Sequence, residues 1–181
     1  MQPNLYTVVN PQKLEDMLQT FFDCVGLAIS ALDTAGQPLT SCGGTCEFCQ
    51  YFGQYLPPDQ SCAQLHAKAG QRAVSIGETY IFSCHAGLSH IVFPLISQKA
   101  LLGSILVGPF LMEAPDSLLI SDIDRHYHLN TEALLELYEA SHKIPVILPA
   151  KVTRISHLLY YLFSGLIPDS KMELLMNQKK L

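Results

Sequence analysis

Three apolar runs separated by short turns constrain the fold of this chain most strongly. They span residues 79–84, 90–97 and 100–110, and Gly or a polar pair lies between them. Short runs of this kind, bounded by turn residues, predict β-strands. Because the connections are too short for a crossover, neighbouring strands are expected to pair in antiparallel order. The middle of the chain therefore predicts a sheet.

The segments before these strands predict a helix and a hairpin. Asn10 and Pro11 are a favoured helix cap and a favoured first helical residue, and apolar residues then recur at helical spacing up to Gly26. Residues 27–41 indicate two short strands around a turn. Residues 42–58 show no clean period, so we expect an ordered loop there.

The remaining segments complete an α+β pattern. A second helix is expected after residue 59 and places Cys62 in its first turns, on the inward face. From residue 117 onward, apolar spacing predicts helices only. We therefore expect a five-stranded antiparallel sheet with helices on one face and a helical C-terminal extension, an order that resembles the PAS and GAF sensory folds. Residues 1–168 are expected to form one domain, and residues 169–181 to begin a linker helix.

Charge and hydropathy exclude several functions. The formal net charge is −5 and no block of Lys or Arg is present, so we expect no nucleic acid to bind this domain directly. No apolar stretch reaches the ~20 residues that a membrane span requires. We also find no pairing of a nucleophile with a base and no phosphate loop, and expect no enzyme. A cytoplasmic location is expected.

Cysteines carry the main chemical signal. In a reducing compartment the six cysteines are more typical of metal ligation or redox chemistry than of disulfides. Cys46-x-x-Cys49 has the spacing of two thiolate ligands from one loop, while Cys62 and Cys84 would add ligands from a helix and a strand end. His85 follows Cys84, but strand alternation would point it to the other face. We therefore expect a zinc or iron–sulfur centre held by Cys46, Cys49, Cys62 and Cys84.

The same residues resemble a known family. Phe48-Cys49, Cys62 and the run Ser-Cys-His-Ala-Gly-Leu at residues 83–88 look like the PocR-type sensory domain of bacterial regulators. The resemblance implies a PAS-like sensor of small organic molecules such as diols, placed before an output module that binds DNA or carries an enzyme. It also carries the family's cysteine positions over to Cys49, Cys62 and Cys84. Cys46 matches no such position. If the family's three thiolates are the shared ligands, the fourth metal ligand could be Cys46, His85 or an exogenous group.

An effector site is expected beside the cysteines. The residues assigned to it are His85, Phe48, Tyr51, Tyr55 and Ser83. Tyrosine hydroxyls would suit a diol, although aromatic side chains beside a helix are more often core residues.

Two other functions stay open. The cysteines could form a thiol-based or iron–sulfur redox sensor, or a structural zinc clip in an interaction domain. Cys46-x-x-Cys49 as a redox dithiol is less favoured, because such motifs normally begin a helix and helix signals start only at Pro57-Pro58. The wide apolar face of residues 152–166 also predicts a homodimer through the C-terminal helices.

Overall fold

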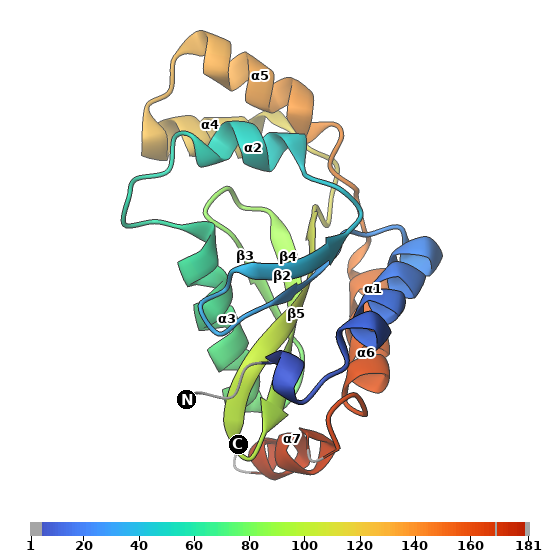
Figure 1. The fold of residues 1–181 in the computed structure, drawn as a ribbon. Helices are drawn as coiled ribbons and strands as arrows, with labels where there is room; N and C mark the ends of the chain where they lie inside the picture. Colours follow the sequence, from blue (N-terminus) through green and yellow to red (C-terminus); the bar gives the residue numbers. More distant parts are fainter. Residues whose placement is uncertain (1–4, 169, 180–181) are drawn as a thin grey trace.

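A five-stranded antiparallel sheet forms the centre of the computed structural model, which describes residues 5–168 and 170–179 (Figure 1). The strand order is β2-β1-β5-β4-β3, with β2 and β3 at the edges. The strands are β1 (Ile29–Leu32), β2 (Pro38–Cys42), β3 (Tyr80–Ser83), β4 (Ser89–Ser97) and β5 (Ala100–Phe110). The expected fold class and all five strands are confirmed.

Helices surround this sheet, and most begin where the sequence predicts. The Asn10 side chain accepts a hydrogen bond from the Lys13 amide at the start of α1, and Gly26 ends α1 at a φ of 74°. Ser61 caps α3 in the same way through the Gln64 amide. The helices are α1 (Pro11–Val25), α2 (Glu47–Gly53), α3 (Cys62–Ile76), α4 (Ser117–Tyr127), α5 (Thr131–Ser141), α6 (Pro149–Phe163) and α7 (Ser170–Gln178), with a 3-10 turn, η1, at Leu5–Thr7.

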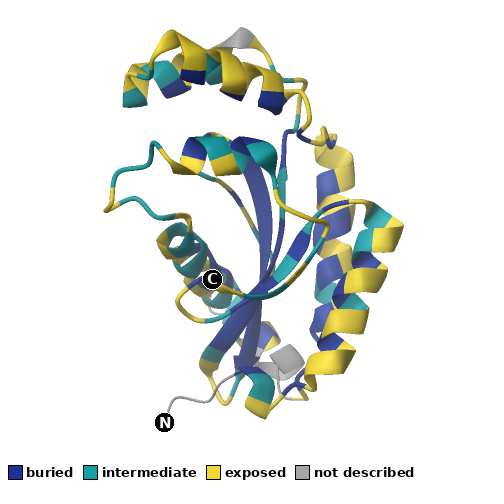
Figure 2. Ribbon diagram, turned by 45° about the horizontal axis from the view of Figure 1, so that its top comes forward, coloured by how far each residue is buried: buried dark blue, intermediate teal, exposed yellow. Residues whose placement is uncertain are grey.

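Both faces of the sheet are covered, whereas we expected helices on one face. α1 and α6 pack on one side, where Phe93 of β4 contacts the rings of Tyr160 and Phe163. α3 packs on the other side, where Ala69 and Ala73 lie against the sheet. Figure 2 shows the resulting burial of β4 and β5 along most of their length. Two covered faces explain why these runs are nearly continuous in apolar residues.

The helix α2 lies in residues 42–58, where we expected only an ordered loop, so this expectation was wrong. The helix has seven residues and Cys46 as its N-cap, without a capping side-chain hydrogen bond. Phe48 and Phe52 are buried and pack in a small core with α4 and α5. Tertiary packing therefore supports α2, and Figure 1 shows it between the sheet and the α4–α5 pair.

α7 packs on the domain. Its Leu174 is fully buried, and the side chains of Asn177 and Gln178 donate hydrogen bonds to the carbonyls of Val74 and Gly77 near the end of α3. The expected division of the chain at residue 168 stays a prediction, as does an output module beyond it. Asp169 itself lies outside the described residues.

No helix among the described parts of the chain combines the length and apolar character of a membrane span.

The expected homodimer also stays a prediction. On α6, Val152, Ile155 and Leu159 are buried against the domain, while Tyr161 and Leu162 are exposed. If this outer face pairs with a second copy, light scattering should give a mass that rises from one chain to two with concentration. A single-chain mass over the whole concentration range would contradict the prediction.

Candidate functional site

One cavity of about 420 Å³ lies between α2, α3 and the sheet, and we call it the central cavity. The strands supply small polar residues such as Ser30 and Ser41, whose hydroxyls are hydrogen-bonded at 2.8 Å. α2 and the segment before it supply Thr45 and Gln50, and α3 supplies His66. The remaining wall comes from the turn after β3 and from the facing ends of β4 and β5.

All four cysteines assigned to the expected metal centre line the central cavity: Cys46, Cys49, Cys62 and Cys84. Cys46 and Cys49 come from the start of α2, Cys62 from the first turn of α3, and Cys84 from the turn after β3. Cys46, Cys49 and Cys84 are half-buried, whereas Cys62 is exposed. The sequence therefore identified four residues that the fold brings to one cavity.

Cys84 and His85 both line the central cavity, although strand alternation predicted that they would point apart. The reason is that β3 ends at Ser83, so the two residues belong to a turn. The Cys84 amide donates to the Leu88 carbonyl and the Gly87 amide to the Cys84 carbonyl, at 2.8 and 2.9 Å. Gly87 has a φ of 76°, a conformation that favours glycine. A turn frees both side chains from alternation.

The thiols do not share one electrostatic environment. A hydrogen bond from the Cys49 thiol lowers the pKa of Cys46 to about 7, and the amides of Phe48 and Cys49 act in the same direction. This hydrogen bond and burial raise the pKa of Cys49. Burial also raises the pKa of Cys62 and of Cys84. Cys46 is therefore the thiol that ionises most readily in this group.

The donor set does not fit a metal ion as it stands. Among the described residues, no three side chains of His, Cys, Asp or Glu are grouped so that they could hold one ion. The four thiols come from three elements, and they would have to move together before they could bind one metal. The zinc or iron–sulfur centre therefore stays a prediction.

Two histidines in the central cavity were missed by the sequence analysis. His66 and His90 have ring centroids 5.7 Å apart, and the His90 ring stacks on Phe82 at 5.3 Å. Burial, with repulsion from a neighbouring imidazole, lowers the pKa of both histidines to about 4, so both are neutral at pH 7. His66 follows Cys62 by four residues and shares its helix face, a signal that could have revealed it. His90 carries no comparable local signal.

His85 completes the histidine group. It lines the central cavity as expected, and its Nε2 atom is buried without a hydrogen-bond partner. A buried polar atom without a partner is costly and commonly marks a place where water or a ligand binds. The structure thus gives His85 an unsatisfied polar atom at the site.

The other residues assigned to effector binding do not line the central cavity. Phe48 is buried in the core that joins α2 to α4 and α5. Tyr51 packs against the same core, and its hydroxyl donates to Glu47 at 3.3 Å. Tyr55 is half-buried just after α2. Ser83 is exposed on β3, on a different hollow. Their assignment to an effector site stays a prediction.

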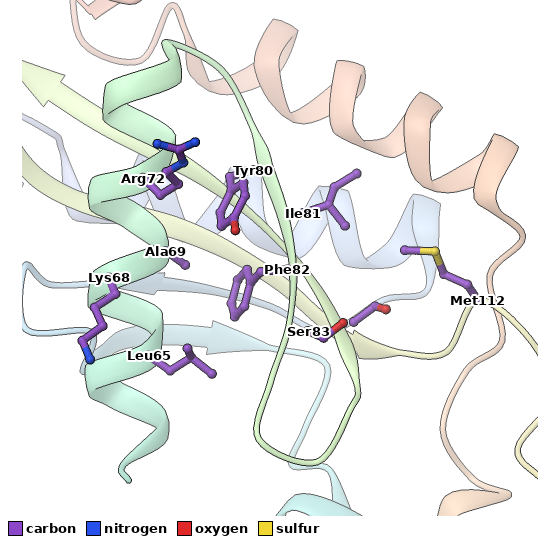
Figure 3. A pocket seen from close by; sticks show the side chains of 10 residues that line it. Leu65, Lys68, Ala69, Arg72, Tyr80, Ile81, Phe82, Ser83 and Met112 are labelled. Atoms are coloured by element: carbon purple, nitrogen blue, oxygen red, sulfur yellow. The ribbon is translucent and has the colours of Figure 1, made fainter. Parts of the chain in front are cut away.

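This second hollow follows the outer edge of β3 and measures about 540 Å³ (Figure 3). Tyr80 and Phe82 face α3, which adds Lys68 and Arg72, while Ile81 and Ser83 lie on the opposite side of the strand. Because neighbouring strand residues point to opposite faces, the hollow wraps around an exposed edge. The central cavity, by contrast, is lined by Cys46, Cys49, Cys62 and Cys84 together with His66, His85 and His90.

Comparisons with known proteins agree with this geometry. The model for the sensory domain found in PocR matches residues 7–170, which include every element that lines the central cavity. Regulatory protein PocR of Salmonella typhimurium is 24% identical over 131 residues, which is 72% of this chain and 43% of that protein. The chain thus spans less than half of this relative's length. No solved structure matches. With a PAS-like sheet and a family match over nearly all of its length, this chain belongs to the PocR sensory-domain family.

Proposed function

We propose that this domain senses a small uncharged molecule with hydroxyl groups, such as 1,2-propanediol, in the central cavity. The observation that supports this proposal most directly is that the described residues lining the cavity include no Asp, Glu, Lys or Arg. His66 and His90 are neutral at pH 7, because their pKa is lowered to about 4. An anionic occupant would therefore lose its hydration without gaining a cationic partner among these residues.

Polar atoms on the wall support a hydroxyl-bearing occupant. The hydroxyls of Ser30, Ser41 and Thr45 and the side chain of Gln50 lie among apolar groups. The Nε2 atom of His85 has no hydrogen-bond partner, and a ligand hydroxyl could supply one. A volume of about 420 Å³ is near the lower end of the range for ligand sites, roughly 300–1,000 Å³, and suits a small molecule.

α2 is the element through which an occupant would act. It lines the central cavity with Cys49, Gln50 and Phe52, and its opposite side packs on α5. The segment after α5 is joined to the end of β5 by two backbone hydrogen bonds, from Leu111 to Pro145 and from Ile147 to Leu111. This segment leads directly into α6. A shift of α2 could therefore reach α6, and through it a regulatory partner or an output module.

Filling the cavity tests the proposal. Replacing Ser30 by Ile places a larger β-branched side chain on β1 and reduces the space for a ligand, so we expect at least a tenfold weaker affinity for 1,2-propanediol. Isothermal titration calorimetry measures this change. Ser97→Ile is the matched control, because it makes the same substitution on a strand position that is half-buried like Ser30 and lies outside the cavity. Equal diol affinity in both variants, or no measurable affinity in the unmodified protein, would contradict the proposal.

A further inference from the structure

The start of α2 brings two thiols together in a way that effector sensing does not require. Cys46 is the N-cap of α2, and Cys49 is its third helical residue. Residues three apart at the start of a helix are neighbours on its surface, with Cβ atoms roughly 5–6 Å apart. Both thiols line the central cavity, and each shifts the pKa of the other. The expectation that no helix begins at this motif was wrong, and with it the argument against a dithiol.

Small molecules can reach this pair. Cys46 is half-buried and lines both the central cavity and an adjoining hollow of about 280 Å³ formed with Gly43, Gly44 and Glu47. Cys49 lines the central cavity and is also half-buried. A reagent entering the adjoining hollow meets Cys46, since Cys49 does not line it, whereas both thiols face the central cavity. The pair is therefore accessible without unfolding α2.

The other four cysteines are placed differently. Cys24 is exposed on α1, and Cys42 lies on β2 against the main core. Cys62 and Cys84 line the central cavity, but they belong to α3 and to the turn after β3. Only Cys46 and Cys49 lie within one helical turn of each other. Local geometry thus selects one pair of thiols.

We propose that Cys46 and Cys49 form a reversible disulfide by exchange with a small-molecule disulfide of the glutathione type. The Cys46 thiolate attacks one sulfur of the reagent, a mixed disulfide forms, and the first glutathione leaves as a thiolate. The Cys49 thiolate then attacks the Cys46 sulfur, its proton having passed to water, and releases the second glutathione. Two protein thiols are oxidised and one external disulfide is reduced, a balanced two-electron exchange. The state of the cavity wall would then depend on the thiol redox conditions as well as on the bound effector.

The experiment uses the full chain in a Cys24→Ser background, which removes the exposed thiol. Protein purified under reducing, oxygen-free conditions is incubated with oxidised glutathione, alkylated and digested, and its cysteines are located by mass spectrometry. We expect the loss of two free thiols, a peptide linking Cys46 to Cys49, and full recovery with dithiothreitol. In the Cys49→Ser variant the reaction should stop at glutathione bound to Cys46.

Cys46→Ser is the second variant, and it should fold because serine is a favoured N-cap residue. It should form no internal disulfide. A disulfide between other cysteines, five thiols that stay free in this background, or protection of all thiols by stoichiometric bound zinc would overturn the proposal. The outcome is separate from effector sensing, because it is read without any cavity ligand.

Discussion

Acidification from pH 7 to pH 4 is expected to lower the free energy of unfolding by about 3 kcal/mol or more. Burial holds the pKa of His66 and of His90 at about 4 in the folded chain, whereas an unfolded histidine has a pKa of about 6.5. Between these two pKa values both histidines are protonated in the unfolded chain but mostly neutral in the folded chain. The contribution of these histidines to the free energy of unfolding is therefore constant above about pH 6.5 and decreases as the pH is lowered from there.

Other groups near these histidines do not reverse the sign. The central cavity includes His85 and four thiols, and no carboxylate is found among its described lining residues. Glu47 acts in the same direction at lower pH, since a hydrogen bond from Lys143 lowers its pKa, but this ion pair is at the surface and contributes little. The decline between pH 6.5 and 4 should therefore follow the histidines.

Urea unfolding at a series of pH values measures this decline. Replacing both His66 and His90 by Phe keeps aromatic rings in the cavity but removes the groups that bind protons, so the decline should largely disappear. His157→Phe is the control, because His157 is exposed on α6 and should leave the profile unchanged. If the double variant loses stability in acid as steeply as the unmodified protein, the histidines are not the cause.

Replacing Gly36 by Ala is expected to lower the free energy of unfolding by about 2–4 kcal/mol. Gly36 ends the β1–β2 turn, where the Asp33 carboxylate accepts hydrogen bonds from the amides of Ala35 and Gln37 at 2.9 and 2.8 Å. Its φ is 79°, and a Cβ atom would lie 2.0 Å from the Ala63 carbonyl oxygen in α3. The turn would have to move away from α3 and open one side of the central cavity.

Gly26→Ala separates the effect of backbone strain at a positive φ from the effect of the contact with α3. Gly26 has nearly the same φ, 74°, but its Cβ would meet no described atom within 4 Å. This variant should therefore lose only the backbone contribution, about 1 kcal/mol. Urea unfolding gives both free energies, and diol affinity should fall only in Gly36→Ala. Equal destabilisation in the two variants would show that the contact with α3 contributes nothing.

Local signals predicted most of the fold. Asn10, Pro11 and Gly26 define α1, and the three apolar runs define β3 to β5. α2 was missed because it is short, begins at a cysteine without a capping hydrogen bond, and depends on distant packing of Phe48 and Phe52. The second covered face of the sheet was also missed, although nearly continuous apolar runs such as β4 and β5 are typical of strands buried on both sides.

The candidate site was also predicted only in part, because local signals reveal some of its residues and distant packing brings in the others. The cysteines were found because their residue type and spacing carry chemical meaning. Cys84 and His85 were assigned to a strand although they form a turn, so the alternation argument failed for them. His66 and His90 come together only when α3 packs on the sheet, a contact that no local pattern in the sequence encodes.

An NMR titration with two compounds of similar size tests most directly whether the central cavity binds an uncharged small molecule. One compound is 1,2-propanediol, and the other is lactate, which carries a carboxylate in place of an alcohol. We predict saturable amide shifts for the diol at Ser30, Cys49 and His66, and at least tenfold weaker binding of lactate. Equal or tighter binding of lactate, shifts confined to the β3 edge at residues 80–83, or no saturable shift with the diol would contradict the prediction.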